Sequence, residues 1–169
     1  FEQRLLIARQ VARIISHTHN QDCVHRDLKP ENIFLVKGRE GERDWVRLLD
    51  FGIGKSLKRP GTVLTRVGGI RGTPNYMAPE QFEGQSDQRS DVFCLGLVIY
   101  FIFRGEHAMK EHDLYKALSE RHALMYKPLN VGGINDEHVA NIVSRACRFE
   151  PSKRYEQGCD VVLALETSN

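Results

Sequence analysis

His25-Arg26-Asp27-Leu28-Lys29-Pro30-Glu31-Asn32 is the segment in which this chain concentrates side chains suited to chemistry. Its Asp27, Lys29 and Asn32 bring a proton acceptor, a phosphate-binding cation and a metal-binding amide into one short segment. Pro30 disfavours a continuous helix through the segment, because proline lacks a backbone N–H and its ring clashes with the preceding turn. We therefore expect a loop that displays three functional side chains.

A second acidic motif, Asp50-Phe51-Gly52, follows this loop after a strand-like run of apolar residues. Gly52 can adopt backbone angles that other residues avoid, so the carboxylate of Asp50 is expected at a sharp change of chain direction. Phosphoryl transfer depends mainly on positioning and on neutralising the charge of the phosphate oxygens. The two motifs together supply residues of the types that this chemistry needs.

The loop resembles the catalytic loop of eukaryotic-type (Hanks-type) serine/threonine protein kinases, and Asp50-Phe51-Gly52 resembles their metal-binding motif. Ala78-Pro79-Glu80 resembles the end of the activation segment, and Arg154 resembles the late arginine that pairs with this glutamate. Met77-Ala78-Pro79-Glu80-Gln81 looks like the bacterial branch of the family. The resemblance implies a protein-kinase-like fold that is mainly α with a small β-hairpin. Residues 1–169 would form the C-terminal (large) lobe, with an activation segment at 50–80.

The resemblance also implies a role for each motif residue. Asp27 would orient the substrate hydroxyl and accept its proton, and Lys29 would hold the γ-phosphate of ATP. Asn32 would complete the catalytic set and, with Asp50, ligate the Mg²⁺ ions that bridge the phosphates. Lys29, Asn32, Asp50 and Phe34, the floor under the adenine, would bind the nucleotide, although a core aromatic is an alternative for Phe34. The structural residues would be His25, Phe51, Glu80, Asp91 and Arg154.

Arg26 lies directly before Asp27 and, in the family, would receive a phosphate from the activation loop in a charge-assisted contact. Thr62 and Thr65 are the leading phosphorylation sites, within a glycine-rich segment expected to be mobile. The alternative is that Arg26 pairs with a nearby acid. Thr73 belongs to the substrate loop, and Lys29 with Thr73 resembles the serine/threonine class.

Hydrophobic periodicity predicts a mostly helical lobe. Apolar residues at spacings of three and four predict a first helix within residues 1–19, and two short apolar runs, 33–36 and 45–49, predict the hairpin. Ser90-Asp91 is expected to begin a buried central helix that Gly105 ends, with Asp91 bonded to the backbone of the catalytic loop. Further helices are expected at 113–124, 137–149 and 160–166.

Composition bounds the remaining possibilities. The 24 Lys and Arg residues nearly balance the 22 Asp and Glu residues, so charge predicts neither a nucleic-acid partner nor a membrane surface. The four cysteines suggest neither a zinc site nor a disulfide framework, which fits a reducing compartment. The longest apolar run, 92–103, is shorter than the ~20 residues of a membrane span. We expect a cytoplasmic segment, compatible with a membrane anchor elsewhere in the full-length protein.

The sequence leaves alternatives for function. The first is an ATP-dependent serine/threonine kinase that acts on a protein substrate. The glycine-rich loop, the strand lysine and the helix glutamate of such a kinase would lie in an N-terminal lobe before Phe1. The chain alone would therefore be nearly inactive. The second is a non-catalytic kinase-like lobe that binds or regulates a protein, for which the intact Asp27, Asn32 and Asp50 have no use. The third, a small-molecule phosphotransferase, is disfavoured by Thr73 and the Ala-Pro-Glu segment.

Overall fold

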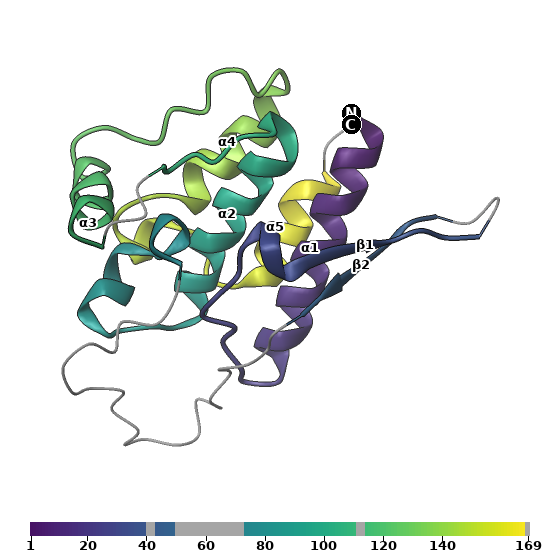
Figure 1. The fold of residues 1–169 in the computed structure, drawn as a ribbon, viewed down its shortest axis with the longest axis horizontal. Coiled ribbons are helices and arrows are strands. Elements are labelled where there is room, and N and C mark those ends of the chain that lie inside the picture. The colour runs from purple at the N-terminus through teal and green to yellow at the C-terminus, as the bar shows by residue number, and fades with distance from the viewer. Residues whose placement is uncertain (40–42, 50–72, 111–113, 168–169) are drawn as a thin grey trace.

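The fold, described by a computed structural model for residues 1–39, 43–49, 73–110 and 114–167, is mainly helical (Figure 1). The described helices surround a buried central helix, and a two-stranded antiparallel sheet extends from one side. The predicted fold class is confirmed. Four short 3-10 helices join these elements: η1 (Pro30–Asn32), η2 (Pro74–Tyr76), η3 (Pro79–Glu83) and η4 (Pro151–Lys153).

Helix α1 (Glu2–Asn20) buries the apolar stripe that its sequence predicts: Leu5, Ala8, Val11, Ala12 and Ile15. Two of its arginines also bind neighbouring elements. Arg4 donates to the carbonyl of Phe103 at 2.8 Å, and Arg9 donates through two nitrogens to the carbonyl of Leu165 at 2.7 and 3.0 Å. These contacts hold α1 beside the central helix and the last helix.

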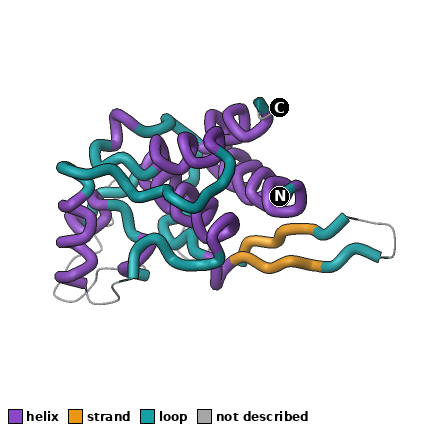
Figure 2. Tube along the Cα trace, turned by 90° about the horizontal axis from the view of Figure 1, so that it is seen from above, coloured by secondary structure: helices purple, strands orange, loops and turns teal. Residues whose placement is uncertain are grey.

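The predicted hairpin consists of β1 (Ile33–Val36) and β2 (Trp45–Leu48), paired so that Ile33 lies opposite Leu48. The hairpin extends away from the helices (Figure 2). Its base is fixed by Gln10 of α1, whose Oε1 accepts a hydrogen bond from the backbone N–H of Val46 at 2.8 Å. The backbone N–H of Leu49 also donates to the carbonyl of Asn32 at 2.8 Å. The loop that contains Asn32 and the chain leading to Asp50 are therefore held together.

The central helix α2 (Gln88–Arg104) begins one turn earlier than predicted. Its N-cap is Asp87, whose side chain accepts hydrogen bonds from the backbone N–H groups of Arg89 and Ser90 at 2.8 and 3.2 Å. Ser90 instead completes the capping box by accepting from the backbone N–H of Asp87. The helix ends as predicted at Gly105, which has a left-handed backbone with φ of 72°.

The remaining helices are α3 (Leu114–Ala123), α4 (Glu137–Ala146) and α5 (Gly158–Glu166). Helix α4 ends before the predicted Phe149, and the carbonyls of Arg148 and Phe149 accept hydrogen bonds from Arg154. Helix α5 begins before the predicted Asp160, at Gly158, which packs directly on the backbone of α1. Among the described helices, none is both long and apolar enough to span a bilayer.

Candidate active site

Asp91, in the first turn of α2, anchors the loop that carries the functional side chains. Its carboxylate is fully buried and accepts hydrogen bonds from the backbone N–H groups of His25 at 2.6 Å and Arg26 at 2.8 Å. Arg26 has a positive φ of 70°, a conformation that costs energy for a residue with a side chain. The two bonds to Asp91 hold the loop in this conformation, and they are the contacts that the resemblance implies.

His19, at the end of α1, supports Asp91 from behind. Its Nδ1 accepts a hydrogen bond from the backbone N–H of Gly158 at 3.0 Å, so Nδ1 carries no proton. The proton of the neutral ring therefore lies on Nε2, which is 3.1 Å from Asp91 Oδ2. His19 thus connects the first turn of α5 to the catalytic loop through Asp91. Spacing gave no reason to expect this role, because the three residues are far apart in sequence.

Asp27, Lys29 and Thr73 form a compact cluster at the surface of the loop. Asp27 Oδ1 accepts from the backbone N–H of Thr73 at 3.2 Å, and Oδ2 lies 3.1 Å from the ammonium of Lys29. Lys29 Nζ also donates to the Thr73 hydroxyl at 2.6 Å. The side chains of Asp27 and Lys29 are about four-fifths buried, with 21% and 20% exposed. Two donors therefore fix the direction of the Asp27 carboxylate, which stays partly exposed.

Asn32 is the third predicted catalytic residue, and it too contacts Asp27. Its Nδ2 donates to the backbone carbonyl of Asp27 at 2.9 Å and lies 3.5 Å from Oδ2. This arrangement commits the NH₂ end of the amide to the loop and leaves the amide oxygen as a ligand. An oxygen ligand suits Mg²⁺, so Asn32 fits the predicted metal site. The other predicted ligand, Asp50, lies outside the described residues, as do Phe51, Thr62 and Thr65.

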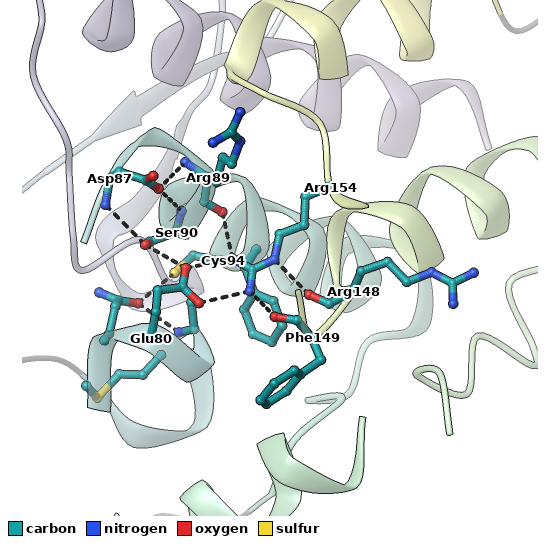
Figure 3. A network of polar contacts seen from close by, with 12 residues as sticks. Glu80, Asp87, Arg89, Ser90, Cys94, Arg148, Phe149 and Arg154 are labelled. Atoms are coloured by element: carbon teal, nitrogen blue, oxygen red, sulfur yellow. Dashed lines mark hydrogen bonds and ion pairs between the residues drawn. The ribbon is translucent and has the colours of Figure 1, made fainter. Parts of the chain in front are cut away.

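A buried ion pair connects the Ala78-Pro79-Glu80 segment to the end of the lobe (Figure 3). Arg154 binds Glu80 through two parallel contacts of 2.7 and 2.9 Å. Its guanidinium also donates to the carbonyls of Arg148, Phe149 and Arg89 at 2.7, 2.7 and 3.0 Å. Ser90 donates its hydroxyl proton to Glu80 at 2.7 Å. Burial raises the pKa of Glu80, but the hydrogen bonds and charge of Arg154 outweigh it, so the net pKa is lowered.

Comparison with known proteins identifies the family. A family model described as the protein kinase domain matches residues 2–162. The chain belongs to the protein kinase family. The kinase pkn3 of Myxococcus xanthus is 46% identical over 102 residues, which cover 59% of this chain and 18% of the relative. The kinase pkn2 of the same organism is 38% identical over 170 residues, covering 98% of this chain and 20% of the relative.

More distant bacterial relatives give the same result. The serine/threonine-protein kinase PrkC of Bacillus subtilis is 28% identical over 169 residues, covering 99% of this chain and 25% of the relative. The predicted family and its bacterial branch are thereby confirmed. The chain spans about a fifth to a quarter of the length of these curated relatives.

In this kinase lobe, Gln81 joins two motifs that are remote in sequence. Its Oε1 accepts from the backbone N–H of Ala78 at 2.8 Å, and its Nε2 donates to the carbonyl of Arg26 at 3.0 Å. The sequence drew attention to Gln81 only as a mark of the bacterial branch. Its dual hydrogen bonding was missed, because an amide beside a motif gives no signal of its partners.

Two predicted kinase residues have surroundings that bear on their roles. Phe34 lies on β1 with 49% of its surface exposed, so it does not belong to the core formed by the described residues. Its place under the adenine stays a prediction. Arg26 has a buried Nε without a hydrogen-bond partner among the described residues, and no ion pair within those residues includes it. The alternative pairing with a nearby acid therefore has no support in that part of the chain.

Proposed function

We propose that residues 1–169 form the C-terminal lobe of a serine/threonine protein kinase that transfers the γ-phosphoryl group of ATP to a protein hydroxyl. Residues 50–80 are the activation segment of this lobe. An N-terminal lobe supplies the glycine-rich loop and the strand lysine, and the 169-residue chain alone has little activity. The single observation that carries the proposal is the cluster of Asp27, Lys29 and Thr73, to which Asn32 is bonded.

Asp27 orients the acceptor hydroxyl and receives its proton. Two fixed donors, the Thr73 N–H and the Lys29 ammonium, bind its carboxylate, so the direction of Asp27 is set before substrate arrives. Lys29 lies between Asp27 and the Thr73 hydroxyl, where its positive charge can also hold a phosphate oxygen. Positioning of this kind supplies most of the rate in phosphoryl transfer.

Asn32 and Asp50 would hold Mg²⁺, and Phe34 would contribute to binding the adenine of ATP. When bound, Mg²⁺ neutralises charge on the phosphates. The contribution of Asn32 is an amide oxygen, since its NH₂ end is committed to the carbonyl of Asp27. Asp50 follows directly after Leu49, whose backbone N–H is bonded to the carbonyl of Asn32. This bond holds the residue before Asp50 beside Asn32.

The activation segment regulates this site through Arg26. Phosphorylation of Thr62 or Thr65 would give the guanidinium an anionic partner, consistent with the unpartnered buried Nε of Arg26 among the described residues. A charge-assisted contact at this point would act directly on the loop, because Arg26 is adjacent to Asp27.

The test is phosphoryl transfer to a serine-containing peptide by the full-length protein, with Asp27→Asn compared to wild type. We expect kcat to fall at least about 100-fold, the usual contribution of a positioned proton acceptor. Asp22→Asn is the matched control, because Asp22 is exposed, lies five residues earlier and has a positive φ of 53° that asparagine tolerates. Equal activity in Asp27→Asn and wild type would contradict the proposal.

A further inference from the structure

Arg121, on α3, is a charged residue buried without an assigned role. Its side chain has no exposed surface, and it is the largest fully buried side chain among the described residues. Its Nε donates to the carbonyl of Met77 at 2.8 Å, and its NH2 nitrogen donates to the carbonyl of Pro74 at 2.8 Å. One guanidinium therefore spans both ends of η2, the turn that follows Thr73.

The polar contacts of Arg121 are directed at this turn rather than at an acid. Within the described residues, its only carboxylate contact is with Glu120, at a long 3.5 Å and with 29% of the Glu120 side chain exposed. The Phe93 ring lies 5.8 Å from the guanidinium carbon. Burial lowers the pKa of Arg121 to about 10, so the side chain remains charged at neutral pH. Burying a charge is costly, and an apolar side chain would fill the space at lower cost.

The turn that Arg121 holds is continuous with the catalytic cluster. Thr73 is the N-cap of η2, and its carbonyl accepts from the backbone N–H of Tyr76 at 2.8 Å. The N–H of Thr73 donates to Asp27, and its hydroxyl accepts from Lys29. A shift of Pro74 would therefore displace Thr73 directly, and with it two of the groups that fix Asp27.

We infer that Arg121 is a positioning residue for phosphoryl transfer, which holds the Thr73–Met77 segment from α3 so that Thr73 meets Asp27 and Lys29. The inference rests on the proposed function of the cluster. The guanidinium geometry matters as much as its charge. Because two carbonyls are bound by two nitrogens of one planar group, the ammonium of a lysine cannot reproduce both contacts.

The test compares Arg121→Lys and Arg121→Met with wild type in the full-length protein. Lys116→Met is the matched control, since it removes an exposed cation from the same helix. For both Arg121 variants we expect kcat/KM for a serine peptide, per folded molecule, to fall about 10- to 100-fold, the effect of a small misplacement. The KM for ATP should stay within about twofold of wild type. Amide hydrogen exchange at Tyr76 and Met77 should become faster in both Arg121 variants. Lys116→Met should change neither the kinetic constants nor these exchange rates.

Three results separate the possible failures. Unchanged kcat/KM per folded molecule in Arg121→Lys would overturn the inference. This variant keeps the positive charge, so it still provides the test when Arg121→Met does not fold. If the apparent kcat/KM values for the peptide and for ATP fell equally, in proportion to the unfolded fraction, Arg121 would have only a structural role. That result would also overturn the inference. Absence of any transfer by wild type would instead contradict the proposed function. Unchanged exchange at Tyr76 and Met77 would then still show that Arg121 does not hold the segment.

Discussion

Replacement of Arg154 by methionine is expected to destabilise the lobe more than any surface change. Methionine approximates the length of the arginine side chain but removes the two contacts to Glu80 and the three to backbone carbonyls. Because the Arg154 side chain is fully buried and that of Glu80 is only 13% exposed, the glutamate loses its counterion with little access to water. Among the described residues, the remaining carboxylate keeps only the Ser90 hydroxyl as a side-chain donor.

Removing one partner of a buried ion pair typically costs ~3–5 kcal/mol, because the other charge is left uncompensated. A domain of this size unfolds in urea with a slope of ~1–3 kcal/mol per M, so the midpoint should fall by about 2 M. That loss is a large part of the ~5–15 kcal/mol by which such domains are stable. Arg154→Met is therefore expected to be partly unfolded near physiological temperature.

The assay is urea unfolding of the purified chain, followed by far-ultraviolet circular dichroism. Arg148→Met is the control, since the exposed Arg148 side chain points away from the network while its carbonyl remains as an acceptor (Figure 3). Adding Glu80→Gln to Arg154→Met should recover part of the loss, because the uncompensated charge is removed. A destabilisation below about 1 kcal/mol in Arg154→Met would refute the reasoning, since the pair would then behave like an exposed one.

Three further predictions concern the same scaffold. The pKa of Glu80 is lowered in the folded state, so its stabilising contribution should be complete at neutral pH and lost as the pH falls below the usual value of 4.5. Denaturation curves of Glu80→Gln and wild type should therefore converge in acid. A difference in unfolding free energy that stays constant with pH would be contrary evidence. Gly158→Ala should lower stability by about 1–3 kcal/mol in thermal unfolding, because a Cβ there would lie 2.6 Å from the backbone nitrogen of Ser16; an unchanged melting temperature would speak against this packing. Asp91→Ala should leave the buried N–H of His25 unpaired, at about 1–3 kcal/mol, and remove the acceptor of the part-buried Arg26 N–H, and it should reduce phosphoryl transfer by the full-length protein; wild-type stability and rate would rule out the anchoring role.

Local patterns in the sequence were sufficient for much of the fold. The apolar stripe of α1 and the two apolar runs of the hairpin each follow a period that one element type requires. Gly105 marked the end of α2 because a left-handed residue there favours glycine. The start of α2 was predicted at Ser90-Asp91, but the N-cap is Asp87 and Ser90 is the N3 partner in its capping box, because both residue types favour helix starts and the apolar run alone does not separate them.

The contacts that organise the candidate site were harder to predict. Asp27, Lys29 and Asn32 share one loop, so their proximity follows from the chain itself. His19, Gln81 and Arg121 act through partners remote in sequence, and nothing in their spacing marks a buried hydrogen bond. An arginine on a helix such as α3 is expected to face solvent. Its complete burial depends on how the chain around η2 packs, which is information that only the folded structure contains.

The most direct measurement supplies full-length protein with Mg²⁺ and ATP labelled on the γ-phosphate. Three otherwise identical peptides offer serine, threonine or tyrosine as the acceptor, and the label on each is counted. If the Asp27 cluster works as a serine/threonine kinase site, the serine and threonine peptides become labelled, the tyrosine peptide does not, and Asp27→Asn abolishes the signal. Labelling of none of the peptides, or labelling that survives in Asp27→Asn, would contradict the account.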